Sequence, residues 1–244
     1  MYKNYIFDLY GTLIDINTDE GSYELFEKIS FLMCYRGAVY EPTNLRDRYY
    51  ALIKTEQKKM QKKHPDYKFV DVHIEQVFKK LYKDKGVIIT DDDAAAIMAA
   101  FRSFCTKYIK LYDGVTDLLD ELKKRGKKIY LLSNAQRNFT WGEIVMTGLE
   151  KRFDGILISS DEEVSKPDPK FYDILFKRYG LKKSESIMIG NDSVTDILGA
   201  KNYGIDSLYI HQSISPPITE PLQSKYKVLD GDVFKIKGLV LGKE

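Results

Sequence analysis

The sequence predicts an α/β protein built on a parallel β-sheet, and three observations carry that prediction. Short, continuously apolar segments recur through the second half of the 244-residue chain. Segments with apolar residues at three- and four-residue spacing separate them, which is the pattern of helices. A long stretch from about residue 20 to 110 shows the helical pattern alone and contains almost no glycine. We therefore expect a helical insertion into a Rossmann-like sheet protein.

The first expected strand covers residues 3–8, which are aromatic and β-branched and end at Asp8, before a Leu-Tyr-Gly-Thr turn. Short apolar strands that alternate with helices are typical of a parallel sheet with helices on both faces. The other expected strands are 128–133, 155–159, 186–190 and 206–210, and the helices among them are 114–125, 139–149, 169–179 and 193–203. Residues 228–241 are expected to form a closing strand or a short helix.

The inserted stretch is expected to contain four helices. Thr90 precedes three aspartates, which predicts a capped helix start because acids are favoured in the first turn. A metal site at these aspartates is disfavoured because consecutive helical positions point in different directions. The four helices are expected at 21–36, 43–63, 69–83 and 91–110.

The resulting division is a Rossmann-like core of residues 1–15 and 110–244 with a helical cap of residues 16–109. Hinges are expected near Asp15-Ile16 and near residues 112–114. A cap of this kind is expected to close over the strand ends and exclude water.

Composition excludes several classes of protein. The chain has 38 Lys+Arg against 36 Asp+Glu, so it lacks the basic excess expected of a nucleic-acid or acidic-membrane partner. No apolar run reaches the roughly 20 residues of a membrane span. Two cysteines, Cys34 and Cys105, are too few for a disulfide scaffold. We expect a cytoplasmic protein with no nucleic-acid or membrane partner, and the oligomeric state is left open.

Polar side chains follow the expected strands where each one ends. Ligands bind at the carboxyl ends of the strands in open parallel sheets, so we expect these side chains to converge. They are Asp8, Thr12, Ser133, Asn134, Lys166, Asp192 and Asp196. Carboxylates suit Mg²⁺, and one lysine among them favours both an anionic ligand and an ionised, nucleophilic Asp8. The pattern predicts a site for an anion and a divalent metal.

The segments Asp8-Leu-Tyr-Gly-Thr-Leu, Ser133-Asn134, Lys166-Pro and Asp192-Ser-Val-Thr-Asp196 resemble, in this order, the four motifs of the haloacid dehalogenase (HAD) superfamily. The resemblance covers residue 3 to about 211, and the helical insertion falls where that superfamily places its C1 cap. It implies that Asp8 forms a covalent aspartyl intermediate. It also implies that Thr12, Ser133 and Asn134 hydrogen-bond the transferring group.

The same resemblance implies roles for the remaining site residues. Lys166 would bridge the nucleophile and the substrate anion. Mg²⁺ would be bound by Asp8, Asp192 and the main-chain carbonyl of Tyr10, with Asp196 supporting the site from behind.

One position departs from the phosphatases of this superfamily, which usually have a second Asp where this chain has Tyr10. That Asp is the general acid and base, and a phenol is a poor base at neutral pH. The segment is similar to the first motif of the L-2-haloacid dehalogenases, which need no metal. Those enzymes grip their substrate with a cap arginine, for which Arg36, Arg46 and Arg48 are candidates.

The fourth motif favours the phosphatases, because Asp192 and Asp196 have the spacing of the Mg²⁺-dependent enzymes. We therefore predict an Mg²⁺-dependent phosphatase acting on a small phosphorylated metabolite. The alternatives are a haloacid dehalogenase-like hydrolase and a weakly active phosphate-binding protein. His64, His73 and His211 are without ligand spacing and are expected at the surface.

Overall fold

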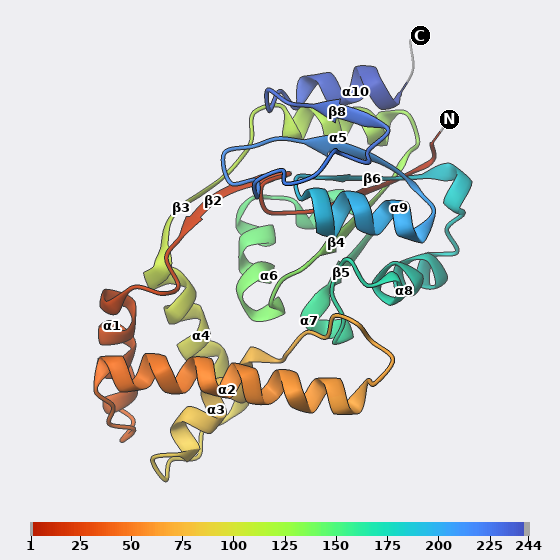
Figure 1. Cartoon of the computed structure of the whole chain (residues 1–244). Helices are drawn as coiled ribbons and strands as arrows, with labels where there is room; N and C mark the ends of the chain where they lie inside the picture. Colours follow the sequence, from red (N-terminus) through yellow and green to blue (C-terminus); the bar gives the residue numbers. More distant parts are fainter. Residues whose placement is uncertain (1, 242–244) are drawn as a thin grey trace.

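The computed structural model describes residues 2–241, and its centre is a parallel six-stranded sheet, five strands of which the sequence predicts (Figure 1). The sixth strand ends where residues 228–241 begin, which were expected to form a closing strand or a short helix and which contain a helix. The strand order is β5-β4-β1-β6-β7-β8, so the first strand of the chain lies in the middle. The strands are β1 (Asn4–Phe7), β4 (Lys128–Ser133), β5 (Gly155–Ile158), β6 (Ser186–Gly190), β7 (Asp206–Ile210) and β8 (Tyr226–Val228). Every neighbouring pair in this sheet runs parallel.

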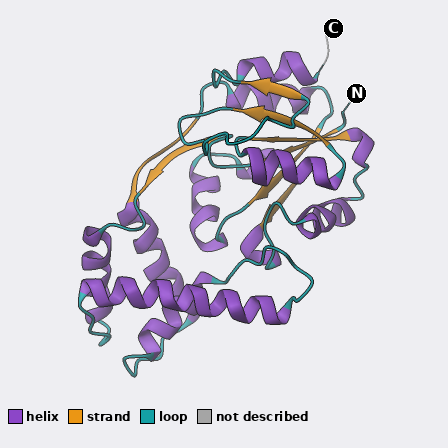
Figure 2. Cartoon of the chain, viewed as in Figure 1, coloured by secondary structure: helices purple, strands orange, loops and turns teal. Residues whose placement is uncertain are grey.

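Helices cover both faces of the sheet, as Figure 2 shows. One apolar layer packs against α5 (Val115–Lys124), α6 (Arg137–Met146) and α10 (Phe234–Val240). The other packs against α8 (Pro169–Tyr179) and α9 (Gly199–Tyr203). Between strands and helices lie short turns: a four-residue α7 (Ser159–Glu162), a π-helical turn (Ser193–Leu198) and two 3-10 turns (Glu150–Arg152 and Lys183–Glu185). The predicted α/β fold is confirmed.

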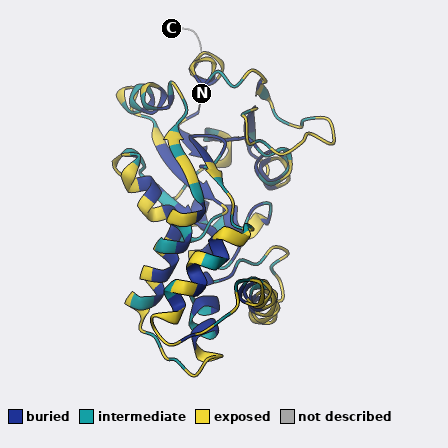
Figure 3. Ribbon diagram, turned by 90° about the vertical axis from the view of Figure 1, so that its left-hand side faces the viewer, coloured by how far each residue is buried: buried dark blue, intermediate teal, exposed yellow. Residues whose placement is uncertain are grey.

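The inserted stretch forms a helical unit, the name used here for α1 (Tyr23–Cys34), α2 (Pro42–Lys63), α3 (Ile74–Lys83) and α4 (Asp91–Cys105). Its own apolar centre contains the packed rings of Phe26, Tyr49, Phe78 and Phe101. Buried residues fill most of the six-stranded sheet and the inner faces of these helices, while exposed residues lie on the outward faces (Figure 3). Thr90 caps α4 in a capping box with Asp93, as predicted.

The connection between the helical unit and the sheet differs from the prediction. Residues 106–110 were expected to be helical, but α4 ends at Cys105 and β3 (Thr106–Leu111) pairs antiparallel with β2 (Ile14–Thr18). Residues 15–16, expected to be a hinge, therefore lie within a strand. Ile16 pairs with Ile109, so the two predicted boundaries between core and cap lie opposite each other in this two-stranded ribbon.

The third helix also begins later than predicted, at Ile74 rather than residue 69. Residues 64–73, called the junction segment here, run instead as an irregular chain that crosses onto the loop after β5. His64 and His73 were expected at the surface, but their side chains are only 23% and 32% exposed, and both contact Glu163 of that loop. Among the described residues, no helix is long and apolar enough to cross a membrane.

Candidate active site

The predicted site residues gather at the carboxyl edge of the sheet, because their strands are parallel neighbours there. Asp8 directly follows β1, Asn134 follows β4, and Asp192 lies two residues beyond β6. They face a pocket of about 240 Å³. The pocket is lined by Asp8, Tyr10, Asn134, Lys166, Asn191, Asp192, Thr195, Asp196, Ile214 and Pro216.

Lys166 joins two of the carboxylates at the floor of this pocket. Its Nζ lies 2.6 Å from Oδ1 of Asp8 and 2.7 Å from Oδ1 of Asp196, and Lys166 is only 2% exposed. Burial by itself would lower the pKa of Lys166, but the charges of Asp196 and Asp8 raise it above the ordinary value. Burial raises the pKa of the Asp196 carboxyl, and the ammonium of Lys166 opposes that effect. The ammonium therefore stays charged and fixes the Asp8 carboxylate.

The three hydrogen-bonding residues are placed differently from one another. The Thr12 hydroxyl has two acceptors within reach of its single proton, Oδ2 of Asp8 at 3.4 Å and Oδ1 of Asn191 at 3.3 Å. The Asn134 side chain binds the backbone of Lys166 in both directions, at 2.7 and 2.8 Å. Its amide thus positions Lys166 directly, a contact that the sequence did not predict.

Ser133 is a buried hydroxyl with a different environment. Within the described part of the chain, its Oγ is buried without a hydrogen-bond partner. An unpaired buried polar group is costly, and such groups call for an explanation such as a ligand or water that completes them. Ser133 is the last residue of β4, next to β1 in the sheet, so its hydroxyl is at the correct edge to bind an anion held at Asp8.

The fourth strand end is built around Asp192 and Asp196. Oδ1 of Asp192 accepts hydrogen bonds from the backbone amides of Val194 and Thr195, at 2.8 and 3.0 Å. Oδ2 of Asp196 accepts the amide of Asp192 at 3.0 Å. A Cβ at Gly190 would lie 2.2 Å from that carboxylate, so only glycine permits this close approach. The two acids are thereby held at fixed positions beside Lys166.

The donor chemistry of this pocket fits Mg²⁺. Among the described residues, no three or more His, Cys, Asp or Glu side chains are grouped to hold a metal ion. Mg²⁺, however, is usually bound through one or two carboxylates and keeps several water ligands. The pocket offers the carboxylates of Asp8 and Asp192 beside Tyr10. These two carboxylates exceed the single ammonium of Lys166, and this excess of negative charge favours a cation.

Tyr10 does not direct its hydroxyl at a reacting group. The phenol donates to Oε2 of Glu143, and its oxygen lies 2.9 Å from Oγ1 of Thr140, within hydrogen-bond distance. Burial and the Glu143 carboxylate raise the pKa of Tyr10 above its ordinary value. Arg102 of α4 lies 5.6 Å from the centre of the Tyr10 ring and binds Glu143 at 2.6 Å. Tyr10 is thus tied to α6 and, through Glu143, to the helical unit.

Sequence reasoning missed Arg102 and Glu143. The available signal was on α6, where Glu143 shares the buried stripe of Phe139, Thr140 and Ile144, an unusual place for an acid. The three arginines that were candidates for binding a dehalogenase substrate do not line this pocket, and each forms an ion pair instead. Arg36 pairs with Asp93, Arg46 with Asp47 and Arg48 with Asp84.

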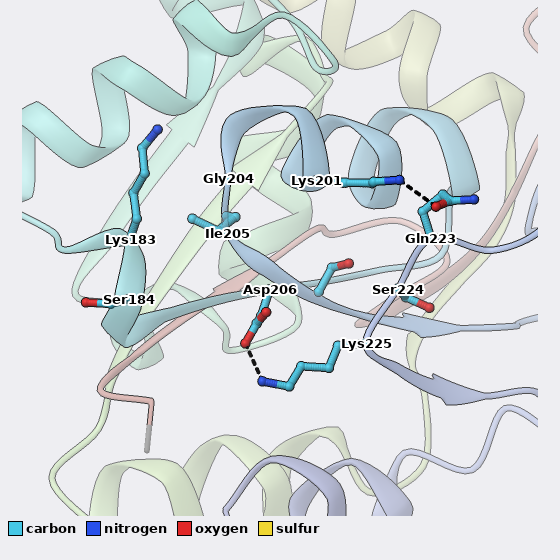
Figure 4. Close-up of a pocket in the computed structure, with 10 residues that line it drawn as sticks. Lys183, Ser184, Lys201, Gly204, Ile205, Asp206, Gln223, Ser224 and Lys225 are labelled. Carbon is cyan, nitrogen blue, oxygen red and sulfur yellow. Dashed lines mark hydrogen bonds and ion pairs between the residues drawn. The ribbon is translucent and has the colours of Figure 1, made fainter.

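A second hollow, of about 380 Å³, lies at the opposite end of the sheet, beside Ser184 and Asp206 near the amino ends of β6 and β7 (Figure 4). Its lysines are already engaged. Lys201 binds Gln223, Lys225 pairs with Asp206, and Lys183 donates to the backbone carbonyl of Tyr203. The reactive groups lie at the carboxyl edge instead, and we assign the candidate active site there.

A parallel α/β core whose strand ends carry an aspartate, a lysine and further acids defines a class of hydrolases. The chain matches the family model of the haloacid dehalogenase-like hydrolases over residues 2–204 and belongs to that family. It is therefore an enzyme, a hydrolase.

The relatives with named activities include a nucleotidase, a phosphatase and a dehalogenase. Pyrimidine 5'-nucleotidase PynA of Streptococcus pneumoniae is 26% identical over 210 residues, 85% of this chain and 83% of that protein. (S)-2-haloacid dehalogenase 4A of Burkholderia cepacia is 24% identical over 229 residues, 91% of this chain and 89% of that protein. Glyceraldehyde 3-phosphate phosphatase of Pyrococcus furiosus is 30% identical over 115 residues, and this chain spans about half of it, 48%.

Solved structures agree on the fold. A HAD phosphatase from Thermococcus onnurineus has a TM-score of 0.62 at 16% identity, with 99% of both chains covered. The HAD hydrolase YfnB from Bacillus subtilis has a TM-score of 0.57 at 18% identity, again with 99% of both chains covered. Both structures share the fold of this chain.

Proposed function

We propose that this hydrolase is an Mg²⁺-dependent phosphatase that acts on a small phosphomonoester through an aspartyl-phosphate on Asp8. The observation that carries the proposal is the ion pair of 2.6 Å between Asp8 and Lys166, at the edge where the Ser133 hydroxyl is buried and unpaired. A fixed carboxylate, a charged amine and a free hydroxyl suit attack on a phosphorus centre that carries negative charge. The phosphatase and nucleotidase relatives support the same choice.

In the proposed reaction, an oxygen of Asp8 attacks phosphorus while the bond from phosphorus to the leaving oxygen breaks. The leaving oxygen takes the electron pair of that bond. Lys166 and the hydroxyls of Thr12 and Ser133 compensate the negative charge of the phosphoryl oxygens. Water then attacks phosphorus while the bond to Asp8 breaks, and the electron pair of that bond restores the carboxylate. The hydrogens of the water leave with the phosphate, which gives one of them through solvent to the leaving oxygen.

Mg²⁺ would be held by Asp8, Asp192 and the main-chain carbonyl of Tyr10, with Asp196 behind them. When bound, the ion neutralises charge on the phosphoryl group. Without it, a substrate dianion would face the carboxylates of Asp8 and Asp192 with only the ammonium of Lys166 to offset them, and repulsion would oppose binding.

The helical unit, with boundaries near residues 16 and 109, is proposed to be the cap of this active site. It has its own apolar centre and is joined to the sheet through the β2–β3 ribbon. Residues 1–15 and 110–244 would then be the catalytic core. A cap that closes over the bound substrate excludes bulk water while Asp8 attacks phosphorus, which strengthens the interactions of Lys166 and the hydroxyls with the phosphoryl oxygens.

Tyr10 shapes the substrate preference in this proposal. Its proton is donated to Glu143, so it does not protonate a leaving group at the site. Substrates whose leaving oxygen needs little protonation, such as aryl phosphates or acyl phosphates, should be preferred over alkyl phosphates.

A dehalogenase remains the second candidate because of two observations. Tyr10 occupies the position that resembles the dehalogenase motif, and Arg102 lies beside it as a cationic group from the helical unit. The full-length similarity to the Burkholderia cepacia dehalogenase supports this candidate. The third candidate is a weakly active phosphate-binding protein, for which we expect phosphate to bind at Asp8 without turnover.

The test is phosphate release from a panel of aryl, acyl and alkyl phosphates, with and without Mg²⁺, for the natural chain and Asp8→Asn. Mg²⁺-dependent release that the substitution abolishes is the expected result. Release equal to that of Asp8→Asn on the whole panel would contradict the proposal. Chloride release from 2-chloropropionate without metal would then identify a dehalogenase. Binding of beryllofluoride with Mg²⁺, in the absence of turnover, would identify a phosphate-binding protein.

A further inference from the structure

A second cluster of charged side chains lies outside the active site, where the junction segment passes α7 (Figure 1). At its centre is Glu163, whose carboxylate binds three basic side chains of the inserted stretch. Nζ of Lys63 lies 2.7 and 2.6 Å from the two carboxylate oxygens. Nε2 of His64 lies 2.5 Å from Oε2, and Nε2 of His73 lies 2.9 Å from Oε1. One carboxylate therefore holds both ends of the junction segment.

Backbone hydrogen bonds continue this contact. The amide of Asp71 donates to the carbonyl of Glu163 at 3.0 Å, and the amide of Ser165 donates to the carbonyl of Phe69 at 2.9 Å. An antiparallel β-bridge joins the same two segments. The junction segment and the loop after β5 are thus bound along several residues, by backbone as well as by side chains.

The backbone of Glu163 is itself unusual. It has a φ of 58°, in the left-handed region, and it is the one non-glycine residue in this state among the described residues. Glycine, asparagine or aspartate would occupy this conformation at lower cost. Such a conformation persists where the surroundings hold it. A long carboxylate at this position is explained by the three basic groups that it binds.

The electrostatics of Glu163 agree with this explanation. Burial by itself raises the pKa of the carboxyl, but the hydrogen bonds from Lys63, His64 and His73 outweigh that effect and lower it to about 2. The carboxylate is therefore ionised at neutral pH and accepts these hydrogen bonds there.

Three residues after Glu163 comes Lys166, whose amine binds Asp8. The backbone of Lys166 is held from the other side by Asn134. Farther along the loop, Oδ2 of Asp168 accepts the amide of Lys68 at 2.6 Å. Residues 163–168 therefore lie between the sheet and the junction segment, and hydrogen bonds tie them to both.

We propose that Glu163 is a positioning residue that fixes the Lys166 amine by binding the helical unit onto the loop that carries it. The proposal rests on the proposed phosphatase function, in which Lys166 binds the substrate anion. With the carboxylate in place, the loop is held on both sides and the amine stays at Asp8. Without it, the backbone bonds to the junction segment remain, but the side-chain contacts from Lys63, His64 and His73 are weakened, and the amine spends more time away from Asp8.

The experiment compares Glu163→Gln with Glu162→Gln. Both variants neutralise a carboxylate and keep its length, but Glu162 pairs with Arg178 of α8, away from the junction segment. Glu163→Asp, which keeps the charge, is the conservative variant. Each protein is treated with an amine-acylating reagent, and modification of Lys166 is followed by peptide mass spectrometry. This readout does not depend on enzymatic activity.

We expect Lys166 to be modified at least about fivefold faster in Glu163→Gln than in the natural chain, because its 2% exposure has to rise before the reagent reaches it. Glu162→Gln should match the natural chain, and Glu163→Asp should lie between the natural chain and Glu163→Gln. Equal rates in Glu163→Gln and the natural chain would overturn the proposal, as would equal acceleration in Glu162→Gln.

Activity supplies the second readout. We expect kcat for phosphate release to fall about tenfold in Glu163→Gln, since small misplacements of a charge-stabilising group are costly. The unfolding midpoint should stay close to that of Glu162→Gln. If the natural chain releases no phosphate but Lys166 still responds to Glu163→Gln, the proposed function fails and the positioning stands. If phosphate is released and Lys166 does not respond, the positioning fails and the function stands.

Discussion

Two charged clusters on the same loop have opposite compositions. At the active site, the carboxylates of Asp8 and Asp196 surround the single amine of Lys166. Three residues earlier, three basic side chains surround the single carboxylate of Glu163. The first cluster is almost fully buried, whereas the basic partners of the second are partly exposed.

The difference indicates that the two clusters have different roles. The buried cluster has excess negative charge and leaves room for a cation and a substrate anion. The exposed cluster is satisfied by its own partners and holds two parts of the chain together. Substitutions should therefore affect chemistry and stability together at the first cluster, and mainly the placement of the loop at the second.

Lys166→Met is expected to have the largest effect. Two buried carboxylates would lose their shared cation, which costs about 3–5 kcal/mol of folding stability. Phosphate release should fall about 10³-fold, because the substrate anion loses its positive partner. Denaturant unfolding and phosphate assays measure the two effects. Lys170→Met, which removes an exposed lysine paired with Asp66, is the control. Retention of more than a tenth of the activity by Lys166→Met would contradict the assignment.

Phe139→Ala tests a second attachment of the helical unit to the core, through α6. Phe139 belongs to α6 but packs in the apolar centre of the helical unit, stacked on Phe101. Its truncation should cost about 3 kcal/mol of unfolding free energy. Trp141→Ala on the same helix, where the side chain is partly exposed, should cost less than about 1 kcal/mol. Equal losses would show that α6 does not anchor the helical unit.

Tyr10→Asp tests the missing general acid. An aspartate at this position can protonate a leaving alcohol, so release from an alkyl phosphate should rise about tenfold. Tyr10→Phe should leave activity unchanged within about twofold, because the hydroxyl that it removes contacts Glu143 and Thr140 and not the reacting groups. Assays with an alkyl and an aryl phosphate separate the cases. No gain in a folded Tyr10→Asp protein would mean that the tyrosine is not what limits turnover.

The smallest expected effect concerns pH. The pKa of Glu163 is lowered from 4.5 to about 2 on folding, so its contribution to stability is complete above about pH 4.5 and is lost as the pH falls towards 2. The natural chain should unfold about 2 °C above Glu163→Gln at pH 7, and this gap should shrink by pH 3. Thermal unfolding at the two pH values measures it. A gap that is the same at both would contradict the assigned contacts.

The sheet could be predicted from sequence because each strand carries its own local signal. The strand at 128–133 is reproduced to the residue, and Pro169 begins α8 as expected. The β2–β3 ribbon was missed because its strands are separated by about 90 residues, and pairing between distant segments leaves no local pattern. A helical continuation from α4 was therefore the simpler prediction for residues 106–110.

The candidate site shows the same limit. Asp8, Lys166 and Asp196 could be predicted to meet, because each follows a strand of one parallel sheet. The partners of Tyr10 could not, since Arg102 and Glu143 reach it only through the packing of α4 on α6. Likewise, nothing near Glu163 in the sequence indicates His64 and His73, which lie about 100 and 90 residues away.

The most direct test of the central claim is to locate the covalent intermediate. The protein is mixed with an aryl phosphate and Mg²⁺, quenched in acid and reduced with borohydride, which converts an aspartyl phosphate into homoserine. Peptide mass spectrometry then identifies the residue. Homoserine at position 8, absent without substrate, is the predicted result. Phosphate release with an unreduced Asp8, or with reduction at another residue, would contradict the account.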